Sequence, residues 1–222
     1  MTAFQDFLDT QEEIYDRFRD TSAVQENGLT PSKPVIEGQG GYLIALRHND
    51  SVVEPMARFA ERLTDIVPVI TYDASNVHTA LSAPHVSPRF APDDQILEEL
   101  AVGVFQMVHA LEKPSISYIE WLYNQDTVIL AGNPDQRFYT NLLKMERFFR
   151  DQGQSLPLPA MAHMTAARFT EPVPPCHLHD FYELMQDAPD IGTSKPEEIL
   201  VGYFTMDAKN GFKVHEYESL IL

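Results

Sequence analysis

The stretch AMAHMTAARF, residues 160–169, places His163 and Thr165 two positions apart among small apolar residues. This composition is typical of a β-strand, in which residues i and i+2 lie on one face about 6.6 Å apart. Imidazole can move a proton near neutral pH, and a threonine hydroxyl can donate a hydrogen bond to a phosphate oxygen. The pair therefore fits a phosphate site, although a core histidine beside a β-favouring threonine has the same pattern.

A second histidine of this kind, His78, lies 85 residues earlier in the stretch NVHTAL, residues 76–81. The hydroxyl two positions after it is missing, because Ala80 stands there. Strand parity turns Thr79 to the other face, unless a β-bulge at 78–80 brings it into the site. Ser82 has the right parity but lies about 13 Å along an ideal strand.

The segment His85-Val86-Ser87 offers a histidine and a serine at the right spacing. However, Pro84 and Pro88 bracket it, and proline is disfavoured inside a central strand. We therefore expect His78, rather than His85, to be the partner of His163. By the same parity argument Arg168 faces away from His163, so we expect it to have a structural role.

Together the two histidine strands resemble the two-histidine (2H) phosphoesterase superfamily, in its RNA 2′,5′-ligase-like and cyclic phosphodiesterase branches. The stretch HMTAAR, residues 163–168, is similar to the second H-x-[ST]-x motif with its trailing arginine, and NVHTAL is similar to the first. The resemblance covers about residues 40–222. It implies an α+β fold in which two antiparallel sheets with flanking helices form a bilobal, pseudo-two-fold arrangement around a central cleft.

The resemblance also implies an activity, that of a metal-independent phosphodiesterase that needs no cofactor. The substrate would be a 2′,3′-cyclic or 2′,5′-linked phosphodiester on a small nucleotide or an RNA end. His78 and His163 would act as acid and base, while Thr165, and Thr79 if a bulge allows, would hold the phosphate. Because Ala80 breaks the first motif, the alternative is a catalytically impaired relative that binds a phosphorylated small molecule or a protein partner in the same cleft.

Composition limits the partners of the chain. Sixteen Lys and Arg against 33 Asp and Glu give a formal net charge of −17, so long nucleic acid is a disfavoured partner and a small phosphorylated ligand is the expected one. A membrane span needs about 20 apolar residues in a row, and no such run is present. With a single cysteine, the sequence leads us to expect a cytoplasmic protein, of an oligomeric state that the pattern does not indicate.

The elements that must position these residues follow from hydrophobic periodicity. We expect an amphipathic helix over 3–20, then a linker to residue 40, and a bilobal domain over 41–222. That domain is expected to repeat the order strand, helix, histidine strand. The expected strands are 42–46, 69–72, 77–81, 115–123, 127–131, 161–169, 199–206 and 212–222, and the expected helices are 51–66, 93–111, 134–150 and 181–185, with a turn at 207–211.

Three other features have less specific patterns. Cys176, His177 and His179 could ligate a metal, but zinc sites of this kind need a fourth ligand, and the preceding prolines favour a surface turn that leads into a helix. Trp121 could stack on a nucleobase or pack in the core. His48 has no evident companion, so we expect it to be a surface or core residue.

Overall fold

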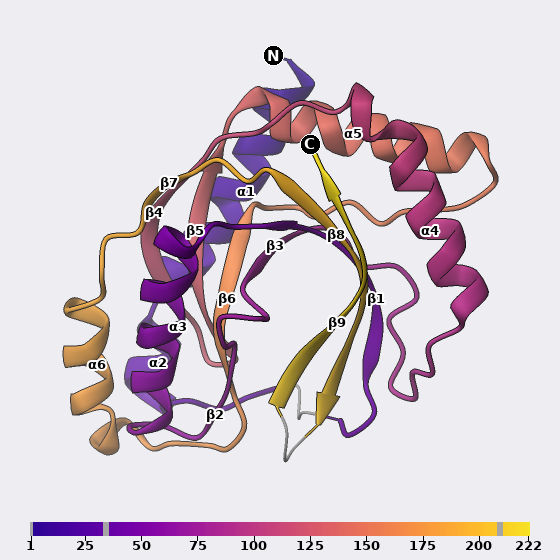
Figure 1. Cartoon of the computed structure of the whole chain (residues 1–222). Coiled ribbons are helices and arrows are strands. Elements are labelled where there is room, and N and C mark those ends of the chain that lie inside the picture. The colour runs from indigo at the N-terminus through magenta and orange to yellow at the C-terminus, as the bar shows by residue number, and fades with distance from the viewer. Residues whose placement is uncertain (1, 33–35, 208–210) are drawn as a thin grey trace.

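Two antiparallel sheets with helices packed around them form the computed structural model, which describes residues 2–32, 36–207 and 211–222 (Figure 1). The first sheet has the order β3-β1-β8-β9 and the second the order β2-β6-β5-β4-β7. The strands are β1 Gly40–Arg47, β2 Val69–Thr71, β3 His78–Ser82, β4 Ile116–Tyr123, β5 Thr127–Pro134, β6 His163–Phe169, β7 Gly192–Ser194, β8 Glu198–Asp207 and β9 Gly211–Ile221.

The described part of the chain also has six α-helices and two short 3₁₀ turns, of which α1 and α2 precede β1. The helices are α1 Ala3–Arg19, α2 Ser22–Asn27, α3 Asp50–Thr64, α4 Asp94–Met107, α5 Gln136–Asp151 and α6 His179–Gln186, and the 3₁₀ turns are Val108–Ala110 and Pro175–His177. None of the described helices combines the length and the apolar composition that crossing a membrane would require.

The predicted fold class is confirmed. β1, α3 and β3 form one strand–helix–histidine-strand unit, with β2 inserted before β3, and β5, α5 and β6 form the other. The two histidine strands belong to different sheets, β3 to the first and β6 to the second. The repeated order read from the sequence thus corresponds to two lobes, each of which contributes one histidine.

The two sheets face each other through a small apolar cluster. This cluster joins Leu43 and Ala45 of β1 to Ile70 of β2 and to Phe212 of β9, and Ala80 packs against it. We call the sheet faces that meet in this cluster the inner faces. The opposite, outer face of the second sheet packs in the main core, which contains Val128 and Leu130 of β5 together with the buried side of α3.

Helix α1 covers part of the inner face of the second sheet. Its Tyr15 and Phe18 pack against Ile129 and Ala131, which alternate along β5 with the outer-face residues. Helix α3 has apolar residues at helical spacing and buries Met56, Phe59 and Leu63 completely or nearly so, which lets it cover the outer face. The second sheet is therefore packed on both sides.

The element boundaries differ from the prediction mainly around residue 134. Strand β5 continues to Pro134, and the cap of α5 is Asp135, whose carboxylate accepts a hydrogen bond of 3.2 Å from the backbone N–H of Phe138. The predicted helix start at Pro134 is therefore wrong. The short elements α2 and β7 were not predicted, and the middle of the predicted turn at 207–211 lies outside the described residues.

Candidate active site

Strand β6 presents His163 and Thr165 on the inner face of the second sheet. In the antiparallel pairing with β5, His163 lies opposite Ala131 and Thr165 opposite Ile129, and both partners are inner-face residues. Both side chains are half-buried, whereas Met164 between them is fully buried on the outer side. The predicted shared face of the histidine and the threonine is therefore present.

A β-bulge in β6 brings Arg168 to the same face. Thr165 pairs with Ile129 but Ala167 pairs with Val128, so the intervening Ala166 has no partner in β5. One extra residue reverses the alternation, and Arg168 returns to the inner face instead of pointing away as parity had predicted. The guanidinium Nε of Arg168 donates a 3.0 Å hydrogen bond to the hydroxyl of Tyr72, which fixes this positive charge in place.

Strand β3 presents His78 and Ala80 on the inner face of the first sheet. The bulge in this strand lies at Leu81, because Ala45 pairs with Ala80 and Ile44 with Ser82. This bulge lies at the last residue of the first motif, after Ala80, and leaves Thr79 on the side opposite to His78. Thr79 is completely buried on the side that strand parity had predicted, so the β-bulge at 78–80 that would have brought it to the phosphate is absent, and the expected contact of Thr79 with phosphate is corrected.

The hydroxyl of Thr79 instead joins a buried polar network with His48. It lies 2.6 Å from the hydroxyl of Tyr118 and 3.0 Å from Nε2 of His48, while Nδ1 of His48 lies 2.8 Å from the hydroxyl of Ser194. Thr79 comes from the first sheet, whereas Tyr118 and Ser194 come from the second. His48 is thus a link between the two sheets, which no local sequence spacing indicates, and burial lowers its pKa to about 3.

The ring of His78 is held in one orientation. Its Nδ1 lies 2.6 Å from the carbonyl oxygen of Asn76, so this nitrogen donates and Nε2 is the unprotonated nitrogen of the neutral ring. The ring also stacks on Phe212 of β9, with 5.9 Å between the ring centroids. The Asn76 side chain bonds the backbone carbonyl of Phe212 and the backbone N–H of Val214, which ties β9 to the start of β3.

The ring of His163 is less well hydrogen-bonded than the ring of His78. Its Nδ1 is buried and makes no hydrogen bond of good geometry to a described residue, although the backbone of Met161 lies close enough to favour the protonated ring. Burial, above all, lowers the pKa of His163 to about 4, and the neighbouring charges of His78 and Arg168 act in the same direction. The strands β3 and β6 also contact each other, and His78 lies close enough to His163 to lower the pKa of that ring.

Helix α1 fixes the backbone directly before His163. The N–H of Ala162 donates a 2.8 Å hydrogen bond to the side-chain oxygen of Gln11, and its carbonyl accepts a 2.5 Å bond from the hydroxyl of Tyr15. Gln11 and Tyr15 are both buried. The start of the second histidine strand is therefore clamped by the N-terminal helix, which lay outside the resemblance seen in the sequence.

The remaining candidates lie elsewhere. His85 occupies an exposed turn after β3 with a positive φ of 54° and contacts the edge of Tyr42, so it is not part of a histidine strand. Cys176 is exposed in the predicted surface turn that leads into α6. On that helix Nε2 of His179 lies 3.3 Å from a carboxylate oxygen of Glu183, and these two side chains form an exposed group with Asp180, which does not include Cys176 or His177.

Comparisons with known proteins address the fold. No protein-family model and no curated protein matches the sequence. Among solved structures, TT0787 of Thermus thermophilus superposes with a TM-score of 0.56 at 12% identity, covering 82% of this chain and 97% of that one. LigT of E. coli, solved with 3′-AMP, superposes with a TM-score of 0.52 at 12% identity, covering 83% of this chain and 98% of LigT.

A conserved protein of unknown function from Agrobacterium tumefaciens, ATU0111, is also similar, with a TM-score of 0.55 at 11% identity. That alignment covers 91% of this chain and 97% of the other. At such identities the similarity concerns the architecture rather than the chemistry. The chain therefore shares the fold of LigT.

Proposed function

We propose that this chain is a metal-independent phosphodiesterase that uses His78 and His163 as its acid–base pair. The substrate class is a small nucleotide or RNA end that carries a 2′,3′-cyclic or 2′,5′-linked phosphodiester. The observation that carries the proposal is the placement of two imidazoles on the inner faces of two different sheets, on strands that contact each other.

In the proposed reaction, one imidazole accepts a proton from water as its oxygen attacks phosphorus. The bond from phosphorus to the leaving oxygen then breaks, and the other imidazole gives this oxygen a proton. The unprotonated Nε2 of His78 fits the accepting role in the free protein. The hydroxyl of Thr165 would donate to a non-bridging oxygen, and Arg168 would add positive charge where negative charge develops.

Both histidines have lowered pKa values, so both rings are neutral near pH 7 before substrate binds. A bound phosphate would raise these pKa values, because a nearby negative charge favours the protonated ring. The substrate itself would therefore help to protonate the histidine that acts as the acid. This coupling fits an anionic substrate better than an uncharged one.

Charge favours a small ligand, because the net charge of −17 opposes a long polyanion. The structurally similar LigT has been solved with 3′-AMP and with ATP, which supports a phosphorylated small molecule here.

One observation favours a second candidate function, a catalytically impaired binder of phosphorylated molecules. The first motif presents Ala80, and the nearby hydroxyl of Thr79 is committed to the buried network. Only one threonine of the two motifs therefore faces the proposed phosphate position. The loss of one donor weakens transition-state stabilisation without removing the acid and the base.

The two candidates are separated by an assay with a matched control. The purified protein is incubated with 2′,3′-cyclic nucleotides and 2′,5′-linked dinucleotides in the presence of EDTA, beside His78→Ala, His163→Ala and His85→Ala. We expect turnover in the wild type and in His85→Ala, and a loss of about 10²–10⁴-fold in the other two variants. Calorimetric binding of nucleotides without turnover would support the binder, and turnover that survives both cleft-histidine variants would contradict the proposal.

A further inference from the structure

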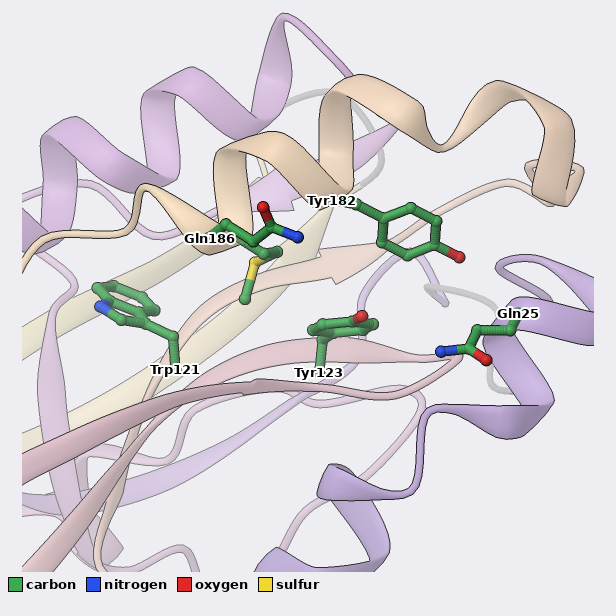
Figure 2. Close-up of a pocket in the computed structure, with 6 residues that line it drawn as sticks. Gln25, Trp121, Tyr123, Tyr182 and Gln186 are labelled. Atoms are coloured by element: carbon green, nitrogen blue, oxygen red, sulfur yellow. The ribbon is translucent and has the colours of Figure 1, made fainter.

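A second pocket, of about 500 Å³, lies on the opposite side of the second sheet from His163. Strand β4 forms its floor, and α6 and α2 form its sides (Figure 2). Trp121 and Tyr123 pair with Leu130 and Val128 of β5, which are outer-face residues. The lining side chains are Gln25, Trp121, Tyr123, Tyr182, Met185 and Gln186.

The aromatic walls of this pocket are held rigidly. Trp121 packs against Phe59 with 4.1 Å between ring centroids, and its indole N–H donates a 2.8 Å hydrogen bond to the carbonyl of Pro189. Tyr123 packs edge-on against Phe181 with 5.0 Å between centroids. Residues i and i+2 of a strand lie on one face about 6.6 Å apart, so the two rings form a preformed platform. Binding to such a platform costs little ordering of side chains.

The polar groups of the pocket can form further hydrogen bonds. The hydroxyl of Tyr182 is buried, yet it has no hydrogen-bond partner among the described residues. The side-chain N–H of Gln25 donates to Thr21, which leaves its carbonyl oxygen as an acceptor at the rim, and Gln186 presents an exposed amide at the other end (Figure 2). A buried hydroxyl without a partner is uncommon in folded proteins and calls for a physical explanation.

We propose that this pocket binds an uncharged heteroaromatic ring of nucleobase type. Ring faces would lie against Trp121, Tyr123 and Tyr182, and ring-edge donors and acceptors would pair with the tyrosine hydroxyl and the two amides. No lining side chain carries a charge, so an uncharged ring is preferred over a phosphate or a carboxylate. The volume lies within the range of about 300–1,000 Å³ that is usual for small-molecule sites.

The site is separate from the proposed catalytic centre. The two lie on opposite faces of the second sheet, so a ligand in this pocket cannot touch His163 or Thr165. The inference therefore does not depend on phosphodiesterase activity, and its test measures binding rather than turnover.

The test uses the single tryptophan of the chain, which lines the pocket. Adenosine, guanosine, cytidine and uridine are titrated into the protein while the fluorescence of Trp121 is recorded. Tetramethylammonium chloride is titrated separately, to compare the binding of a cation with that of an uncharged ring. We expect saturable quenching by at least one nucleoside with a dissociation constant below about 1 mM. Tyr182→Phe, which removes only the hydroxyl, and Gln186→Ala, which changes an exposed side chain, are each expected to weaken binding about tenfold, one lost hydrogen bond being worth about this factor.

Two controls make the result specific. Tyr217→Phe changes an exposed tyrosine outside the pocket, and His163→Ala changes the proposed catalytic centre; both are expected to leave the titration unchanged. The proposal is overturned if no nucleoside gives saturable quenching, or if only tetramethylammonium does. It is equally overturned if His163→Ala abolishes the quenching, which would place the ligand at the catalytic histidines, or if Tyr182→Phe and Gln186→Ala bind like the wild type.

Discussion

Thr165 and Thr79 each lie close behind a histidine in a strand, but their hydroxyls have different surroundings. Thr165 is half-buried on the inner face beside His163. Thr79 is fully buried and bonds to His48 and Tyr118. A change at the first position should therefore affect catalysis, and the same change at the second should affect stability.

We expect Thr165→Val to lower kcat by about 10²–10³-fold with little change in the free energy of unfolding, since the loss of one preorganised donor typically has this effect. Thr79→Val should instead lower the free energy of unfolding by about 1–3 kcal/mol, because it leaves two buried polar groups short of a partner. Activity assays on cyclic nucleotides and urea titrations of both variants measure these effects. The assignment fails if the two variants show the reverse pattern.

The buried histidines predict how stability depends on pH. The pKa of His48 is lowered to about 3 and that of His163 to about 4 in the folded protein, whereas both take up protons near pH 6.5 when unfolded. The unfolded chain therefore binds more protons between these values, so stability falls as the pH drops from about 6.5 to 4. We expect a loss of about 1.4 kcal/mol per pH unit for each ring in that window.

Urea unfolding at pH 7, 6, 5 and 4.5 measures this dependence. The carboxylates add their own acid sensitivity, mostly below pH 5, so the interval from 6.5 to 5 is the informative one. His48→Gln removes one of the buried titrating rings and should reduce the slope in that interval. A slope that is flat in the wild type, or unchanged in the variant, would contradict the buried neutral state of His48.

Among the elements, the histidine strands could be predicted from the sequence, but their bulges could not. The alternation around His163 correctly places it beside Thr165, because parity holds over two residues. Beyond that point, parity failed for Arg168, since the extra residue Ala166 is defined by the register with β5 rather than by its own neighbours. The bulge at Leu81 likewise depends on β1.

The first helix illustrates a second limit of local patterns. Its amphipathic spacing predicts a helix over 3–20, close to the observed Ala3–Arg19. Periodicity shows which side of the helix is apolar, but it does not show against which surface that side packs. The structure places that side on the inner face of the second sheet, where Tyr15 contacts the residue before His163.

This contact predicts a positioning role for Tyr15. Tyr15→Phe removes the hydroxyl that donates to the carbonyl of Ala162 and accepts from the backbone N–H of Gly132, so the start of β6 gains freedom. We expect kcat to fall by about 10- to 100-fold with KM nearly unchanged, because small errors in the placement of a catalytic group are costly. Steady-state kinetics of this variant, with Glu13→Gln on the exposed side of α1 as the control, measure the effect.

A purely structural role for Tyr15 would give another result. In that case the free energy of unfolding would fall, while kcat per folded molecule would stay at the wild-type value. A fall in kcat that is also seen in Glu13→Gln would equally count against the clamp, because that side chain is exposed and away from Ala162.

At the scale of the whole molecule, the fold brings together two histidines that are 85 residues apart in the chain. The repeated strand–helix–strand order, readable in the sequence, gives each sheet one of them. Their mutual approach depends on how the sheets pack, through the apolar cluster around Phe212 and the polar network around His48. Neither contact set has a local sequence signature, so the approach of the histidines was accessible only through family resemblance.

The central claim is that both imidazoles share one phosphate, and a phosphate titration followed by NMR of ¹⁵N-labelled histidine side chains tests it directly. We predict that the ring signals of His78 and His163 shift together with a single dissociation constant, that both pKa values rise on binding, and that the exposed His85 does not respond. Signals that saturate at different phosphate concentrations, or a response from only one of the two rings, would contradict the account.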